Sequence, residues 1–164
     1  MQKKIAYGGM AAALCVILLA LSSYLPTLKA ATLFMASVIP YVVFRFVDGK
    51  TAFLVYFASA VLGFFLCQAG SPVIVVAYCV CFGNYPVFSA LLANKTLVMQ
   101  VIFKTLLYVI YFLTIFLIFT KVLFLPLPYS SYLLFGAGAV AFAVYDFLIP
   151  RTGEYLLNYL RKGD

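Results

Sequence analysis

The chain has 164 residues, of which 67% are hydrophobic and only 9% are charged, and its mean hydropathy is +1.16. A water-soluble domain of this length needs a polar surface, which eleven Lys and Arg and four Asp and Glu cannot supply. These values exclude a soluble globular protein and predict an integral membrane protein. Its net charge of +7 is then better explained by membrane topology than by nucleic-acid binding.

Long apolar runs predict helices rather than the strands of a barrel. The runs are continuous over about 16 to 22 residues, whereas transmembrane strands alternate apolar and polar residues. In chain order, we expect spans at residues 5–23, 32–46, 51–67, 72–92, 97–119 and 132–149. The predicted fold is a single domain, residues 1–164, built as an all-α bundle of six transmembrane helices.

Helix-breaking residues fall between these spans. Prolines follow the first span at Pro26 and the sixth at Pro150, and the other breaks are Asp48-Gly49, Gly70-Ser71-Pro72, Asn94-Lys95 and Pro126-Leu127-Pro128. The second span is short, so we expect it to begin before Thr32 or to be kinked at Pro40. Residues 151–164 are predicted to form a short basic helix on the inner membrane interface.

Basic residues are distributed unevenly over the gaps. One side of the predicted bundle carries nine of them: Lys3, Lys4, Arg45, Lys50, Lys95, Lys104, Arg151, Arg161 and Lys162. The other side carries only Lys29 and Lys121. Basic residues accumulate on the cytoplasmic side of membrane proteins, so both termini are predicted to be cytoplasmic.

Small residues form two pairs with a spacing of four in the first span. Gly8 is paired with Ala12, and Gly9 with Ala13. Such pairs allow another helix to approach closely in lipid. The partner is either a helix of the same chain or a separate protein docked on the cytoplasmic half of this span.

Two polar segments are candidates for substrate binding. The connection from Ser22 to Ala31 contains Tyr24, Thr27 and Lys29, and it either caps an outward cavity or simply joins two helices. Gly83-Asn84-Tyr85-Pro86 interrupts the fourth span. Broken helices often build substrate sites, which makes Asn84 and Tyr85 candidates; the alternative is a kinked helix satisfied by its neighbours.

The chemical inventory argues against an enzyme. Asp146 is the only acid expected within a span, and an ion pair with Lys104 is the favoured interpretation. The chain has no His and no glycine-rich nucleotide motif, and its four cysteines lie in apolar stretches as expected for buried hydrophobic residues. We therefore expect no catalytic residues, no metal and no cofactor, and any transport would need an external energy source.

Several of these motifs together resemble a known family. Lys3-Lys4-Ile5 leads into Gly9 and Ala13, and Pro26, Val38-Ile39-Pro40, the basic turn from Arg45 to Lys50, and Ala60 with Gly63 follow. In this respect the chain resembles the substrate-binding S components of energy-coupling factor (ECF) vitamin transporters. The resemblance covers nearly the whole chain.

The resemblance implies a set of partners and roles. Gly9 and Ala13 would contact a transmembrane coupling protein, which in turn works with ATPase subunits in a bacterial plasma membrane. Residues 24–29 would close over a substrate taken from outside. Because the predicted pocket is poor in polar groups, a rather apolar substrate is expected.

Two other functions remain open. One is a non-transporting membrane scaffold similar to the rod-shape-determining D proteins, which would use the small residues and the basic tail for assembly. The other is a small lipid carrier whose path is lined by Asn84 and Asp146.

Overall fold

A computed structural model describes residues 2–25, 27–67, 72–93, 95–118 and 131–161. The helices are α1 (Gln2–Tyr24), α2 (Lys29–Phe46), α3 (Gly49–Leu66), α4 (Pro72–Ala77), the π-helical turn η1 (Tyr78–Phe82), α5 (Tyr85–Leu92), α6 (Leu97–Leu117) and α7 (Ser131–Arg161). The described residues contain no strand. The predicted all-α fold is confirmed.

Five helical segments in the described part of the chain are long and apolar enough to cross a membrane. They are Lys4–Tyr24, Lys29–Phe46, Gly49–Leu66, Ile74–Leu92 and Leu97–Leu117, and they match the first five predicted spans closely. As expected, α2 begins before Thr32. The predicted loops at residues 70–71 and 126–128, and Lys121, lie outside the described residues.

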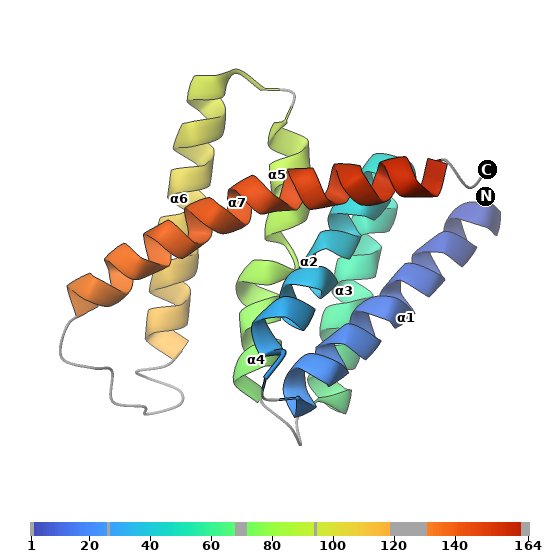
Figure 1. Cartoon of the computed structure of the whole chain (residues 1–164), viewed down its shortest axis with the longest axis horizontal. Helices are drawn as coiled ribbons and strands as arrows, with labels where there is room; N and C mark the ends of the chain where they lie inside the picture. Colours follow the sequence, from blue (N-terminus) through green and yellow to red (C-terminus); the bar gives the residue numbers. More distant parts are fainter. Residues whose placement is uncertain (1, 26, 68–71, 94, 119–130, 162–164) are drawn as a thin grey trace.

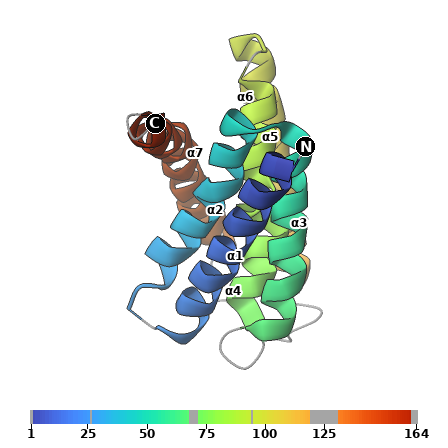
Figure 2. The ribbon, with the colours of Figure 1, turned by 90° about the vertical axis from the view of Figure 1, so that its right-hand side faces the viewer.

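The helices alternate in direction. In Figure 1, α1, α3 and α6 begin at the upper end of the molecule, whereas α2 and α4 begin at the lower end. The start of α1 and the end of α7 both lie toward the upper end, and Figure 2 shows that they are on different sides of it. Helix α7 crosses the other helices obliquely, and α6 stands on the far side of α4 and α5 from α1.

An ion pair ties the upper ends of α1, α2 and α3 together. The Lys4 Nζ lies 2.8 Å from Asp48 Oδ2 in the α2–α3 turn. The other carboxylate oxygen, Oδ1, accepts a 2.7 Å hydrogen bond from the Thr51 backbone N–H and so caps the start of α3. The hydrogen bond from Lys4, followed by those from Thr51, holds the pKa of Asp48 well below its usual range, so the carboxylate stays charged at neutral pH.

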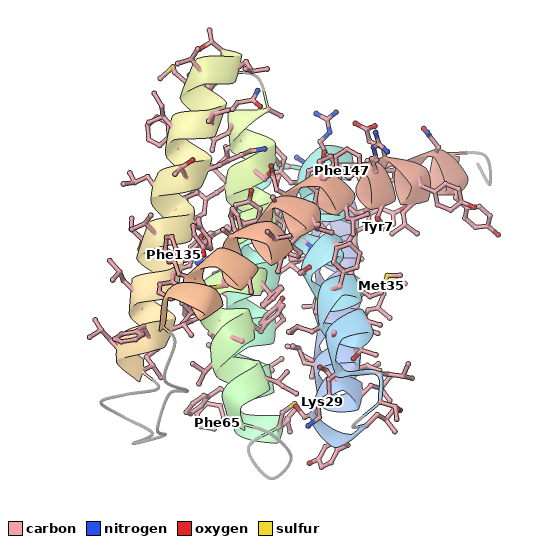
Figure 3. The ribbon with its side chains drawn as sticks, turned by 60° about the vertical axis from the view of Figure 1, so that its left-hand side comes forward. Tyr7, Lys29, Met35, Phe65, Phe135 and Phe147 are labelled. Atoms are coloured by element: carbon pink, nitrogen blue, oxygen red, sulfur yellow. The ribbon has the colours of Figure 1, made fainter. Side chains whose placement is uncertain are left out.

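Described basic side chains gather at this upper end. Arg45 lies in the last turn of α2, Lys50 in the first turn of α3, and Lys95 just before α6. Lys29 lies at the opposite, lower end, as does Phe65 at the end of α3 (Figure 3). The charge asymmetry of the sequence is therefore an asymmetry between the two ends of the folded bundle.

Helix α7 does not break at Pro150, where the sequence predicts the end of the sixth span. Helix α7 runs through Pro150 to Arg161, so the predicted separate tail helix is its continuation. Packing on α2 explains this: Ile149 and Leu157 are buried, and a Cβ on Gly153 would lie 2.4 Å from the Tyr41 ring. A proline interrupts one helical hydrogen bond, and contacts on both sides of it hold the helix together.

The two pairs of small residues in α1 have different surroundings. Gly8 and Ala12 are buried, and a Cβ on Gly8 would lie 3.0 Å from Thr51 Cγ2 of α3. Gly9 and Ala13 are exposed, and a Cβ on Gly9 would meet nothing within 4 Å. The first pair therefore packs within the chain, which is the first of the two alternatives, whereas the second pair has open space beside it.

This difference in surroundings can be tested by placing the same substitution at Gly8 and at Gly9. Gly8→Leu should lower the free energy of unfolding by about 1 to 3 kcal/mol, because the larger side chain overpacks the α1–α3 contact. Gly9→Leu should leave it unchanged, because space is open there. Thermal unfolding of the purified variants in detergent would show this, and equal melting temperatures for both variants would contradict the packing described.

Candidate functional site

The fourth span is interrupted where the sequence predicts it. Between α4 and α5 the backbone forms the π-helical turn η1, in which the Gly83 N–H donates to the Tyr78 carbonyl over 2.8 Å. A Cβ on Gly83 would lie 2.5 Å from the Tyr56 ring. Only glycine permits this close approach of α3 to the broken helix.

Tyrosines from other helices satisfy the backbone of this turn. The Tyr56 hydroxyl of α3 donates to the Cys79 carbonyl over 2.7 Å, and the Tyr145 hydroxyl of α7 donates to the Phe82 carbonyl over 3.1 Å. Buried carbonyls without partners are costly in a membrane interior, so these bonds stabilise the interruption. For these two carbonyls, the alternative of a kinked helix satisfied by its neighbours is what the structure shows.

The two residues singled out in this segment face different partners. The Asn84 side-chain oxygen accepts a 2.9 Å hydrogen bond from the Tyr111 hydroxyl of α6. Tyr85 is fully buried, and its hydroxyl donates to Asp146 Oδ1 of α7 over 2.5 Å. Asn84 and Tyr85 therefore connect the broken helix to α6 and α7.

Asp146 is the centre of a polar cluster. The Lys104 Nζ lies 2.8 Å from its Oδ1 and 2.9 Å from its Oδ2, which confirms the predicted ion pair. Tyr85 and, at 3.5 Å, Ser89 also donate to Oδ1. The Lys104 and Asp146 side chains are only 22% and 25% exposed. The cluster joins α5, α6 and α7.

A cavity of about 460 Å³ lies between α2, η1, α5, α6 and α7. Half of its lining residues are aromatic. The lining consists of Ala30, Leu33, Phe34, Cys81, Phe82, Tyr85, Tyr108, Tyr111, Phe112, Ile115, Gly138, Ala141, Phe142, Val144, Tyr145 and Leu148.

The rings around this cavity contact one another. The Tyr85 ring centroid lies 4.7 Å from that of Phe142 and 5.6 Å from that of Tyr145. All four tyrosine hydroxyls of the lining already donate to protein acceptors, because Tyr108 also donates to the Phe135 carbonyl over 2.6 Å. The wall therefore offers rings and hydrocarbon, with its hydroxyl protons already used.

A second cavity, of about 420 Å³, lies between α6 and α7. It is lined by Val101, Lys104, Thr105, Tyr108, Val109, Phe135, Ala139, Phe142, Ala143 and Asp146. It shares Tyr108 and Phe142 with the aromatic cavity, and their ring centroids are 5.2 Å apart. Figure 3 shows Phe135 beside both helices, at the edge of this space. The ion pair thus lies directly beyond the aromatic wall.

The predicted lid residues do not reach the aromatic cavity. Tyr24, Thr27 and Lys29 are exposed and do not line it, although the next residue, Ala30, does. The connection between α1 and α2 is only residues 25–28, shorter than the segment from Ser22 to Ala31 suggested, because both helices extend into it. The Ser22 hydroxyl donates to the Lys29 carbonyl over 2.9 Å and closes this turn.

Sequence reasoning missed most of the cavity wall. Residues such as Tyr108, Tyr111, Phe142 and Tyr145 look like members of the interfacial aromatic belts common in membrane proteins. Their spacing carried a usable signal, since Tyr108 and Phe112 on α6, and Ala141 and Tyr145 on α7, are four residues apart and share a helix face. Which faces would meet is not encoded in that spacing.

The two cavities offer aromatic rings, hydrocarbon and one ion pair as binding groups. Within the described residues, no three His, Cys, Asp or Glu side chains gather closely enough to hold a metal ion. No known family model matches the chain, and no curated protein or solved structure is significantly similar to it. Function is therefore inferred from the apolar cavity and the ion pair beside it.

The ion pair makes a testable contribution to stability. Lys104→Met and Asp146→Leu should each lower the free energy of unfolding by about 1 to 3 kcal/mol, because each leaves a partly buried charge unpaired. The double variant should lose less than the sum of the two single losses. Unfolding of all four proteins in mixed detergent micelles measures this coupling, and strictly additive losses would show that the pair contributes no mutual stabilisation.

Proposed function

We propose that this chain is a membrane-embedded binding subunit that holds a small, apolar substrate in the aromatic cavity. The cavity itself is the observation that carries the proposal: its volume of about 460 Å³ suits a small organic molecule, and its wall is almost entirely ring and hydrocarbon. Four tyrosine hydroxyls engaged with protein acceptors leave rings as the principal contact surface.

The proposed orientation places both termini in the cytoplasm of a bacterial cell. It is supported by the basic side chains at the upper end of the bundle, and by the start of α1 and the end of α7, which both lie toward that end. The α2 residues of the cavity wall lie in the first two turns of that helix and the α6 residues in its second half, and both of these parts point to the opposite end. The α7 residues of the wall lie in the middle of that helix. In this orientation the cavity occupies the outer half of the membrane, as capture from outside requires. Helix α7 is proposed as the sixth crossing.

We further propose that the chain works as an S-component-like subunit of an ECF-type uptake transporter. The sequence contains no nucleotide-binding motif, so transport would depend on ATPase subunits and on a transmembrane coupling protein. The exposed pair Gly9 and Ala13 on α1 supports this proposal, because small residues on a free helix face allow a second helix to approach closely.

Filling the cavity should abolish ligand binding. Ala141→Phe adds a ring to the cavity wall, and we expect it to reduce co-purified ligand by at least about tenfold, since a filled apolar pocket cannot accept the substrate. Ala137→Phe is the matched control, because Ala137 is exposed on the same helix and does not line the cavity. Native mass spectrometry and solvent extraction of protein purified in mild detergent give the measurement; equal ligand content in both variants would contradict the proposal.

Partner association should depend on the exposed pair in α1. We expect Gly9→Leu combined with Ala13→Leu to lower the recovery of ATPase subunits from gently solubilised membranes by about tenfold, because the added bulk separates the helices. Gly136→Leu is the control, since Gly136 of α7 also has open space around it. Quantitative pull-down from the native host measures this.

The same pull-down distinguishes the alternatives. Recovery of cell-shape proteins in place of ATPase subunits would favour the scaffold. Recovery of neither, together with a bound lipid, would favour an autonomous lipid carrier.

A further inference from the structure

We propose that the ligand is an amphiphilic carboxylate, with its apolar body in the aromatic cavity and its carboxylate group at Lys104. This inference rests on the proposed function, because it assigns a substrate class to the same cavity. It also gives the Lys104–Asp146 pair a role in ligand recognition in addition to its role in packing.

The arrangement of the two cavities is the first support. The aromatic cavity and the cavity that contains Lys104 and Asp146 share two lining residues, Tyr108 and Phe142. The shared wall therefore includes side chains, which can change rotamer without any rearrangement of the helices. One elongated molecule could occupy both spaces if the Tyr108 ring turned aside.

Helix α6 can adjust to such a molecule. Among its described residues only Tyr111 is buried, whereas every helix from α1 to α3 has several buried side chains. Directional polar contacts link it to other parts of the described chain: Lys104 to Asp146, Tyr111 to Asn84, Tyr108 to the Phe135 carbonyl, and Gln100 to the Ala93 and Lys95 carbonyls. A helix held in this way moves at low cost compared with one held by a packed core.

The hydrogen-bonding capacity of the ion pair decides the sign of the ligand charge. Asp146 already accepts from Lys104, Tyr85 and Ser89, so its carboxylate is well satisfied. The Lys104 ammonium has three protons, and in the described part of the chain its only acceptor is that same carboxylate. The group with capacity to spare is the ammonium, which favours an incoming anion.

A carboxylate fits this capacity better than a neutral polar group. A hydrogen bond between an ammonium and a carboxylate is shorter and about twice as strong as one between neutral groups. The surrounding cavity is lined mainly by apolar side chains such as Val101, Val109 and Ala143, so water competes less for the charge than it does at the protein surface. The same carboxylate on a molecule without an apolar body would gain nothing from the aromatic cavity.

The test compares acids with their methyl esters. We would measure, by native mass spectrometry in detergent, binding of 1-pyrenebutyric acid and of hexadecanoic acid, each beside its methyl ester. The full-length protein should bind at least one acid about tenfold or more tightly than its ester, because the ester keeps the apolar body and loses the charge. Lys104→Gln should reduce that preference to about one, and Lys104→Arg should restore most of it.

One control variant and the acid–ester comparison on the unchanged protein keep the outcomes separate. Lys95→Gln makes the same charge change on a lysine that lines neither cavity, and it should retain the preference for the acid. Equal binding of acid and ester to the unchanged protein would overturn the carboxylate site while leaving the apolar cavity as a binding site. The absence of binding by either acid or either ester would overturn both proposals.

The comparison on the unchanged protein does not depend on whether the variants fold. A preference for the acid that survives in Lys104→Gln would place the carboxylate away from Lys104 and would also overturn the proposal.

Discussion

The need to satisfy backbone carbonyls at the π-helical turn Tyr78–Phe82 organises the rest of this structure. A helix that is interrupted inside an apolar environment must find donors elsewhere, and here Tyr56 of α3 and Tyr145 of α7 provide them. Gly83 allows the Tyr56 ring to approach. The interruption thus draws together helices that are distant in sequence, and one of the rings that serve it, Tyr145, is part of the cavity wall.

Charge acts at two separate places in the fold. At the upper end, Lys4 and Asp48 join α1 to the α2–α3 turn, and the other basic side chains nearby give the bundle a direction. Deeper in the bundle, Lys104 and Asp146 hold α6 against α7 in an apolar setting, where an unpaired charge would be costly. The first pair supports the fold, whereas the second lines a cavity and is the pair that we propose takes part in binding.

Apolar runs and breakers predicted the helices well, because an apolar environment leaves the backbone few choices. The pairing of Asp146 with Lys104 was predictable, since a lone acid in an apolar helix needs a partner. Packing between helices was harder to foresee. Pro150 lies within α7 because buried residues, Ile149 before it and Leu157 after it, anchor the helix on both sides. The residues predicted to form a lid do not line the cavity, because α1 and α2 extend into the connection between them. The cavity wall was missed because the same aromatic residue types form interfacial belts and pocket walls.

The central claim is that the aromatic cavity is a ligand site rather than a packing defect. The most direct measurement is an experimental structure of the protein purified from its native membrane without added ligand and held in a lipid nanodisc. We expect non-protein density against the rings of Tyr85, Tyr108 and Phe142, extending toward Lys104. A structure in which α6 and α7 close together and their side chains fill the space would contradict it.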